Sequence, residues 1–305
     1  MTHSNRILVI GSYNMDLSFH VTRLPKPGET LIGKSFHKGP GGKGSNQAIA
    51  AARLGGEVSF MGCIGDDLFG KEALEMFAVE NIDTDYLLVN PEQNTGIASI
   101  VVDESAENQI IVTPGANYYL LPEDIENKVD FQEFSWLVIQ LEVPFPTVKR
   151  AIELAKQSGT KIILNPAPYM EESIEILPFV DLFIPNETEA ELVSGVSISN
   201  MDDVEHAAKI ILEKGAKQVV ITLGSRGVYM ASTAENQFYG EHLVAQKVKA
   251  IDTTGAGDCF VGALAVALSE DKTLRESVRF AISAAGLSVQ RMGAGTGMPY
   301  REELN

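Results

Sequence analysis

Residues 252–258 read Asp-Thr-Thr-Gly-Ala-Gly-Asp, and the apolar run from Cys259 to Leu268 follows at once. The seven residues bring two carboxylates, two hydroxyls and two glycines into one loop, and the run behind them predicts a buried helix. A glycine-rich loop that opens a helix exposes backbone N–H groups at the positive end of the helix dipole, which suits an anion. A carboxylate beside that anion can accept a proton from an attacking hydroxyl, so the stretch predicts phosphoryl transfer to an alcohol.

Each part of this loop has an expected role. We expect the N–H groups of residues 255–257 to hold the transferring phosphoryl group and Asp258 to accept the substrate proton. We also expect the helix dipole to lower the pKa of Asp258, which makes it a weak base that suffices in a loose transition state. The simpler alternative is a glycine turn in which Asp258 stabilises the first helical turn. Such a turn does not need glycines on both sides of Ala256 and a carboxylate at each end.

The remaining chain alternates apolar runs with helical patterns, most regularly after residue 135. Strands are expected at Arg6–Gly11, Val58–Ile64, Trp136–Leu141, Lys161–Asn165, Leu182–Pro185 and Gln218–Leu223. Helices are expected within Gly41–Leu54, at Gly70–Asn81 and Pro146–Ser158, and from Glu187. This order predicts an α/β fold, with a mostly parallel central sheet flanked by helices and ligands at the carboxyl ends of its strands.

The N-terminal third also carries segments of mixed polarity that suit short exposed strands. They are Asp16–Arg23, Thr30–Lys38, Thr95–Val102 and Gln109–Thr113. We predict that they form a small second sheet, a β-sheet lid. The chain then divides into an α/β domain (residues 1–13, 39–94 and 115–305) and the lid (residues 14–38 and 95–114).

Composition excludes several classes of protein. A chain of 305 residues suits one large α/β domain or two modest ones, and its net charge of −17 argues against nucleic acid or anionic membranes as partners. A nucleotide is still possible, because its phosphates can be met locally. Two cysteines, Cys63 and Cys259, imply no disulfide framework and predict a cytoplasmic setting. No apolar run approaches the roughly 18 residues of a membrane span.

Three further motifs have both a structural and a functional interpretation. Residues 39–46 (GPGGKGSN) do not form a P-loop, because Gly44 stands where a P-loop has Ser or Thr. They either form a loop that caps a helix, or they let the backbone approach a small polar ligand, with Lys43 and Asn46 as hydrogen-bond donors. Residues 185–189 (PNETE) form a capping box, and Glu189 could also lie near Mg²⁺ through water. Residues 222–227 (TLGSRG) are either a turn into the next strand or a nucleotide contact.

Asn14, Asp16 and Glu142 follow expected strands. Solvated surface is the default interpretation for each of them. Their shared location at strand ends favours one pocket instead, and a pair of carboxylates with an amide suits vicinal hydroxyls.

Taken together and in order, these motifs resemble the ribokinase family, the PfkB-type carbohydrate kinases, over nearly the whole chain. The segments that carry the resemblance are residues 11–16 (GSYNMD), 41–47 (GGKGSNQ), 140–142 (QLE), 165–168 (NPAP), 185–190 (PNETEA), 222–227 and 252–258. The last is the most specific mark of that family.

The resemblance implies a ribokinase-like fold and ATP-dependent phosphorylation of D-ribose at its 5-hydroxyl. It implies sugar contacts by Asn14, Asp16, Gly42, Lys43, Asn46, Glu142 and Asp258. It implies catalysis by Asp258 as the base, with an anion hole at Gly255, Ala256 and Gly257. It implies ATP contacts by Asn186, Thr222, Gly224, Ser225, Arg226, Gly227, Gly257 and Ile282.

The resemblance also implies cations and a partner subunit. Glu189 would organise Mg²⁺ through water. A monovalent cation, usually K⁺, would lie at Asp252, Thr254, Ser288, Arg291, Gly293 and Gly297, the last four through backbone carbonyls. The final position usually carries a hydroxyl residue in this family, whereas here it is Gly297 with Thr296 beside it. The lid sheet often forms a dimer interface, so a homodimer is expected.

Other substrates within this family and two other classes of protein are alternatives to a ribose kinase. Within the family, the alternative substrates are 2-deoxyribose, fructose and a nucleoside such as adenosine. Asn14 favours ribose over 2-deoxyribose, because its amide can bond the 2-hydroxyl of ribose. With a sugar that lacks this hydroxyl, the amide would be left unpaired at a cost of about 1–3 kcal/mol. A dinucleotide-dependent oxidoreductase would need G-x-G-x-x-G after the first strand, where this chain has GSYNMD. A non-catalytic sugar-binding protein would be expected to lose Asp258 or the loop glycines.

Overall fold

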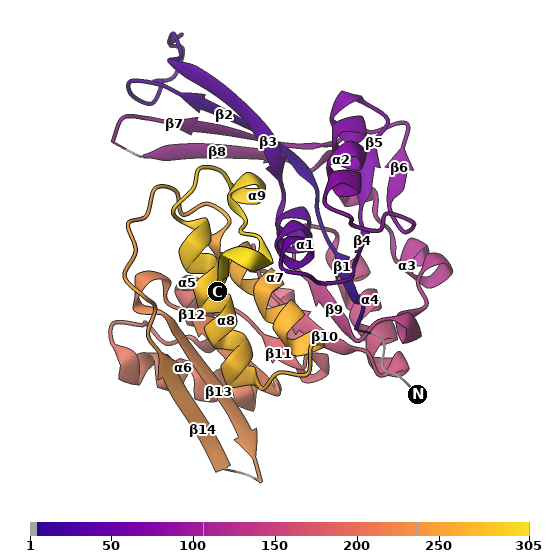
Figure 1. Cartoon of the computed structure of the whole chain (residues 1–305), viewed down its shortest axis with the longest axis vertical. Coiled ribbons are helices and arrows are strands. Elements are labelled where there is room, and N and C mark those ends of the chain that lie inside the picture. Colours follow the sequence, from indigo (N-terminus) through magenta and orange to yellow (C-terminus); the bar gives the residue numbers. More distant parts are fainter. Residues whose placement is uncertain (1–4, 106, 236, 305) are drawn as a thin grey trace.

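The computed structural model describes residues 5–105, 107–235 and 237–304, and within them an eight-stranded sheet forms the centre of the molecule (Figure 1). In spatial order its strands are β14 (Gln237–Leu243), β13 (Val228–Ala234), β12 (Gln218–Thr222), β11 (Leu182–Phe183), β10 (Lys161–Leu164), β9 (Trp136–Ile139), β1 (Ile7–Ile10) and β4 (Val58–Met61). Pairing is parallel from β4 to β12, and β13 and β14 run antiparallel at one edge. The predicted mostly parallel sheet is therefore confirmed.

Helices cover both faces of this sheet, and β1 shows why. Its four residues are all buried, with Ile7 and Val9 in one apolar cluster and Leu8 and Ile10 in another, as the two-residue period of a strand requires. The first cluster includes residues of α1 (Lys43–Arg53), α2 (Leu68–Val79), α7 (Ala256–Ser269) and α8 (Leu274–Ser288). The second includes residues of α3 (Pro122–Lys128), α4 (Phe145–Ser158), α5 (Glu187–Ser194) and α6 (Met201–Glu213).

Shorter elements complete the chain. A four-residue helix, α9 (Ala294–Gly297), precedes the C-terminal segment. The 3₁₀ turns are η1 (Gly115–Tyr119), η2 (Phe131–Glu133), η3 (Glu171–Phe179), η4 (Gly224–Arg226) and η5 (Arg301–Leu304).

A second sheet lies at the upper left of Figure 1, with α9 directly below it. Among the described residues it has four strands in the order β3 (Ser35–Gly41), β2 (Asn14–His20), β7 (Gly96–Val102) and β8 (Asn108–Thr113). The strand expected at Thr30–Lys38 therefore begins later and ends later, and the one expected at Asp16–Arg23 begins and ends earlier. The reason is pairing: β2 and β3 are in register from Asn14 with Gly41 to His20 with Ser35, so the residues between them form the connecting loop.

The strand predicted at Val58–Ile64 is two strands. β4 belongs to the central sheet, whereas β5 (Cys63–Gly65) pairs with β6 (Leu88–Asn90) in a separate sheet. Gly62 separates them: a Cβ there would come within 2.7 Å of the Phe60 ring and 2.8 Å of the Gly11 carbonyl oxygen. Only glycine therefore fits where the chain leaves the central sheet.

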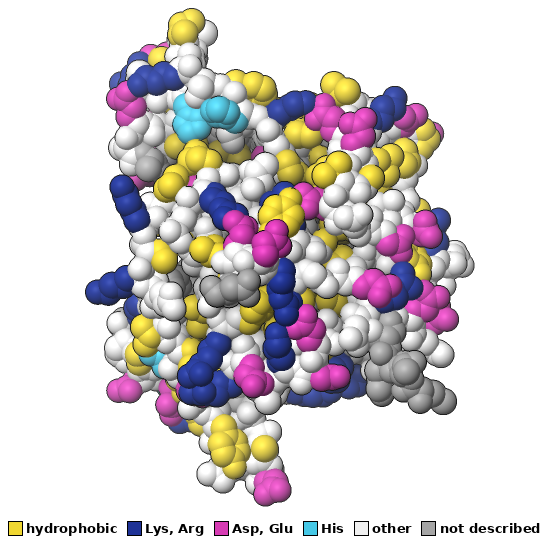
Figure 2. Space-filling model, viewed as in Figure 1, with side chains coloured by type: hydrophobic (Ala, Val, Ile, Leu, Met, Phe, Trp, Pro, Cys, Tyr) yellow, Lys and Arg dark blue, Asp and Glu magenta, His cyan; other side chains and the backbone are white. Residues whose placement is uncertain are grey.

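The surface of the described chain carries charges of both signs. Figure 2 shows Lys and Arg side chains interspersed with Asp and Glu side chains over the face in view, rather than gathered in one basic patch. Several are paired, such as Arg275 with Glu241 and Arg291 with Glu303. In the part of the chain that the structure describes, no helix combines the length and the apolar character that crossing a membrane requires.

Candidate active site

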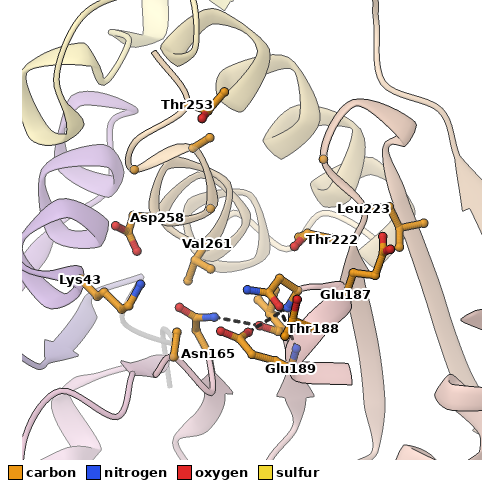
Figure 3. Close-up of a pocket in the computed structure, with 17 residues that line it drawn as sticks. Lys43, Asn165, Glu187, Thr188, Glu189, Thr222, Leu223, Thr253, Asp258 and Val261 are labelled. Atoms are coloured by element: carbon orange, nitrogen blue, oxygen red, sulfur yellow. Dashed lines mark hydrogen bonds between the residues drawn. The ribbon is translucent and has the colours of Figure 1, made fainter. Parts of the chain in front are cut away.

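A cavity of about 510 Å³ opens where the carboxyl ends of β10, β11 and β12 face the N-termini of α1, α5 and α7 (Figure 3). Many residues predicted from the sequence line it: Lys43, Asn186, Glu189, Thr222, Gly224, Gly255, Ala256, Gly257 and Asp258. Sequence reasoning assigned no role to other lining residues, among them Asn165, Thr188, Thr253 and Val261.

The start of α7 is an open helix N-terminus. Its N-cap, Gly255, has φ +74°, and no side chain of the described residues caps the helix there. A Cβ at Gly255 would lie 2.9 Å from the Cβ of Ala294, so both the conformation and the packing need glycine. Ala256 donates its N–H to the Thr253 carbonyl at 3.2 Å. The next N–H groups of the first turn have no acceptor within the helix and border the cavity, which suits an anion.

Asp258 is buried at this terminus, with 7% of its surface exposed. Its Oδ2 accepts a hydrogen bond from Asn46 Nδ2 at 3.1 Å, and its Oδ1 accepts one from Gln47 Nε2 at 3.0 Å. Burial raises its pKa above the ordinary value, although the Lys43 ammonium and the two amides act in the opposite direction. The expectation of a lowered pKa, and hence of a weak base, is therefore wrong, because desolvation outweighs the favourable groups around the carboxylate.

Lys43 is the first residue of α1, and its ammonium points into the cavity beside Asp258 (Figure 3). Burial alone would lower its pKa, but the carboxylates of Asp258, Glu142 and Glu189 outweigh burial and raise it. Lys43 is thus a charged group among carboxylates, placed where it can also meet a phosphate.

Next to these groups, Asp16, Gly42 and Glu142 form a polar corner between β2, α1 and the end of β9. Glu142 Oε2 accepts hydrogen bonds from the Lys43 N–H at 2.9 Å and the Ser12 hydroxyl at 2.5 Å. Gly42, with φ +87°, leaves no room for a side chain against Asn14 and Ser12. Burial, with Glu142 and Asp258 nearby, raises the pKa of Asp16 to about 7.

The orientation of Asn14 is set by a residue that the sequence did not point to. Asn117 lies in η1, and its Oδ1 accepts the backbone N–H of Tyr13 at 2.9 Å. Its Nδ2 therefore donates, both to the Tyr13 carbonyl and to Asn14 Oδ1, each at 2.9 Å. Because Oδ1 of Asn14 is engaged in this way, its Nδ2 is the group that can donate to a ligand.

The N-terminus of α5 is capped by side chains of its own first turn. Asn186 Oδ1 accepts the Glu189 N–H at 2.8 Å, and Glu189 Oε2 accepts the Asn186 N–H at 2.9 Å. The predicted capping box is confirmed. Burial raises the pKa of Glu189, and this carboxylate still borders the cavity.

The described residues contain no cluster of three or more His, Cys, Asp or Glu side chains that could hold a metal ion.

The predicted nucleotide-binding residues divide between the cavity and its surroundings. Thr222 and Gly224 line it, whereas Ser225, Arg226 and Gly227 do not. Arg226 forms an ion pair with Glu187 at the start of α5. Ile282, on α8, packs against the core cluster that contains α7 and is not part of the cavity lining.

The two segments predicted to hold a monovalent cation lie together. Asp252 Oδ1 accepts the Thr254 N–H, and its Oδ2 accepts the Gly293 N–H, both at 2.9 Å. Ser288 and Gly297 are also close, since a Cβ at Gly297 would lie 3.5 Å from the Ser288 carbonyl oxygen. That carbonyl accepts the N–H of Arg291, another residue of the set, at 3.1 Å.

Comparison with known proteins identifies one family. The profile of the pfkB family carbohydrate kinases matches residues 4–301. The ribokinase of Haemophilus influenzae is 40% identical over 298 residues, covering 97% of this chain and 96% of its own. The ribokinase of Staphylococcus aureus is 41% identical over 305 residues, covering 99% of both chains. The structure of Arabidopsis thaliana ribokinase complexed with ribose and ATP superposes with a TM-score of 0.89 at 31% identity, covering 99% of this chain and 97% of that one.

Proposed function

This chain belongs to the pfkB family of carbohydrate kinases, and we propose that it transfers the γ-phosphoryl group of ATP to the 5-hydroxyl of D-ribose, giving ribose 5-phosphate. One observation carries the chemistry. The Asp258 carboxylate lies at the open N-terminus of α7, beside the Lys43 ammonium, in a cavity that extends to Thr222 and Gly224. A base, an anion site and a nucleotide-sized space therefore adjoin one another.

The sugar is assigned to the polar corner around Asp16. The proposed contacts are those of Asn14, Asp16, Gly42, Lys43, Asn46 and Glu142. The proposal is supported by the mixture of carboxylate acceptors and amide donors there, because each sugar hydroxyl both donates and accepts. This placement brings the 5-hydroxyl to Asp258, which accepts its proton as the new O–P bond forms and the bond to ADP breaks.

The phosphates of ATP are assigned to the open end of α7. The N–H groups of residues 255–257 form the proposed anion hole, in which the Ala256 N–H would exchange its 3.2 Å bond to the Thr253 carbonyl for the anion. Lys43 offsets the negative charge of the transferring group. The proposed ATP contacts are Asn186, Thr222, Gly224, Ser225, Arg226, Gly227, Gly257 and Ile282. Glu189 is proposed to hold hydrated Mg²⁺, which supplies further charge neutralisation at the phosphates.

A monovalent cation, K⁺ in our proposal, is assigned to Asp252, Thr254, Ser288, Arg291, Gly293 and Gly297. Its support is the link from Asp252 to the Gly293 N–H and the packing of Ala294 on Gly255. A cation there would fix the loop that carries the anion hole. Gly297 contributes no side-chain hydroxyl, so only its carbonyl is available.

The four-stranded sheet is proposed as a lid over the sugar and as the interface of a homodimer. Its edge strand β8 is exposed throughout, including Ile110, Ile111 and Val112. A lid excludes water, so ATP hydrolysis without sugar is expected to be very slow. The cytoplasm is the proposed location, in keeping with the free thiols of Cys63 and Cys259.

The experiment that tests this function measures ADP release from MgATP with ribose, 2-deoxyribose, fructose or adenosine, each with K⁺ or with a large inert cation. We expect the highest kcat/KM with ribose and K⁺. Turnover on another acceptor would keep the kinase assignment and overturn the choice of sugar. Silence with all four acceptors would overturn the choice of sugar and point to a different acceptor or to a non-catalytic sugar-binding protein.

A further inference from the structure

Asp258 is held by two consecutive side chains of α1, and they hold different oxygens. Asn46 Nδ2 donates to Oδ2, and Gln47 Nε2 donates to Oδ1. Residues that are adjacent on a helix point about 100° apart, so both reach one carboxylate only because α7 begins directly beside this turn of α1. The two oxygens of Asp258 are therefore not equivalent before any ligand binds.

The Gln47 amide is fixed from every side. Its Nε2 donates to Asn165 Oδ1 at 3.1 Å as well as to Asp258, and its Oε1 accepts from Gln140 Nε2 at 2.6 Å. Asn165 is itself anchored, because its Nδ2 donates to the Ile184 carbonyl at 2.9 Å. With a backbone carbonyl at one end and a carboxylate at the other, the orientation of each amide is determined.

Tight packing surrounds this network, although Oε1 of Gln140 is buried without a hydrogen-bond partner among the described residues. Gln47 and Gln140 are completely buried. A Cβ at Gly11 would collide with Oε1 of Gln140 and come within 2.9 Å of the Gly44 Cα. Glycine at position 11 therefore lets Gln140 reach Gln47 across the end of β9, and the tight contacts hold Gln140 in place.

Asn46, by contrast, is incompletely bonded. Its Oδ1 is buried and has no hydrogen-bond partner within the described residues. A buried polar atom without a partner is costly unless a ligand or water meets it. Asn46 can thus still accept a hydrogen bond from a ligand through Oδ1, whereas Gln47 has every polar group engaged.

We propose that Gln47, anchored by Gln140 and Asn165, is a positioning residue that keeps Oδ1 of Asp258 in place and leaves Oδ2 as the oxygen that receives the substrate proton. The inference rests on the proposed sugar phosphorylation. The 5-hydroxyl gives its proton to Oδ2 as its oxygen bonds to phosphorus, and ADP leaves with the electrons of the broken bond. Gln47 touches neither substrate and acts through Asp258.

The surrounding charges explain why such a fixed donor matters. The Lys43 ammonium favours the ionised form of Asp258, whereas Glu142, Asp16 and Glu189 face the same region and oppose it. The hydrogen bond from Gln47 lowers the pKa of Asp258 against these carboxylates. Loss of that bond should move the acid limb of the pH–rate profile to higher pH.

The test compares Gln47→Leu with the wild-type chain, using kcat and kcat/KM for ribose between pH 5 and 9. We expect kcat to fall on the order of 10- to 100-fold, the acid limb to shift upward and the KM for MgATP to change little. Gln140→Leu removes only the hydrogen bond that anchors Gln47, so the acid limb should shift in the same direction by a smaller amount. This second variant tests the proposal if Gln47→Leu does not fold. Thr147→Val removes another buried hydrogen bond, to the Leu120 carbonyl, and serves as the control.

The outcomes separate the two proposals. Failure of the wild-type chain to phosphorylate ribose would overturn the proposed function. The positioning role would be overturned if the wild-type chain phosphorylates ribose and the acid limb of Gln47→Leu is unshifted. If Gln47→Leu does not fold, an unshifted acid limb in Gln140→Leu would overturn it in the same way. A shift of equal size in Thr147→Val would also overturn it, because the effect would then be one of stability alone.

Discussion

Asp258 and Glu189 occupy the same position on two helices of one cavity, yet they are used in opposite ways. Each is the third residue of its helix, Asp258 on α7 and Glu189 on α5. Glu189 turns back and accepts the N–H of its own N-cap, Asn186. Asp258 has glycine at its N-cap and instead meets amides from α1.

The difference shows how a helix start becomes a binding site. At α5, the side chains of Asn186 and Glu189 satisfy backbone N–H groups, so this terminus is stable without a ligand. At α7, no such capping occurs in the described structure, and the first-turn N–H groups remain available to an anion. The same helix position therefore serves stability in one case and, in our proposal, catalysis in the other.

The largest expected difference comes from replacing the two carboxylates by amides. Asp258→Asn removes the proposed base, so we expect kcat to fall about 10²- to 10⁴-fold while ribose still binds. Glu189→Gln is the matched change on α5 and should mainly raise the KM for MgATP. Steady-state kinetics with calorimetric ribose binding checks both. Substantial turnover by Asp258→Asn would reject the base assignment.

The N-cap glycine of α7 gives the next contrast. Gly255→Ala forces alanine to φ +74° and against Ala294, which should displace the anion hole and lower kcat by about 10²-fold. Gly195→Ala is the matched control at the C-cap of α5, with φ +77° and no atom within 4 Å of the added Cβ. It should cost roughly 1–2 kcal/mol of stability and leave kcat unchanged. Equal kinetic losses in the two variants would show that strain alone explains the effect.

Sugar selection should respond more modestly. Asn14→Met removes the proposed donor to the 2-hydroxyl. The ratio of kcat/KM for ribose to kcat/KM for 2-deoxyribose should therefore fall by an amount equivalent to about 1–3 kcal/mol. Asn117→Leu leaves Asn14 in place but frees its amide to rotate, and should narrow the same ratio by less. The readout is the ratio of kcat/KM for the two sugars. An unchanged ratio in Asn14→Met means that another residue makes the choice.

The smallest effect concerns stability and pH. Because the pKa of Asp16 is raised to about 7, this carboxyl is protonated in the folded chain at pH values where the unfolded chain is already ionised. Its contribution to stability is therefore full below about pH 4 and is lost as pH rises towards 7. Asp16→Asn should raise the Tm more at pH 8 than at pH 5, as measured by thermal unfolding at both pH values. A Tm difference independent of pH would contradict the raised pKa.

The local features of the site were readable from the sequence. The capping box of Asn186 and Glu189 is confirmed because its residues lie three apart on one helix, where spacing alone determines contact. The parallel sheet and the separate four-stranded sheet were also predictable, since strand patterns and their order along the chain define them.

What the sequence did not reveal depends on distant contacts. Gln47 and Asp258 are 211 positions apart, and Asn117 and Asn14 are 103 apart. No local pattern marks a glutamine or asparagine as a partner across the fold. The raised pKa of Asp258 was missed for the same reason, because the burial that causes it arises only when α1 and the sheet close around the start of α7.

The most direct test of the contrast between the two helix termini is a crystal structure with ribose, MgADP and aluminium fluoride, which mimics the transferring phosphoryl group. We predict that the fluoride ligands lie about 2.7–3.1 Å from first-turn N–H groups of α7, with the ribose O5 against Oδ2 of Asp258. Aluminium fluoride bound at the start of α5, or an O5 directed towards Glu189 instead, would contradict the account.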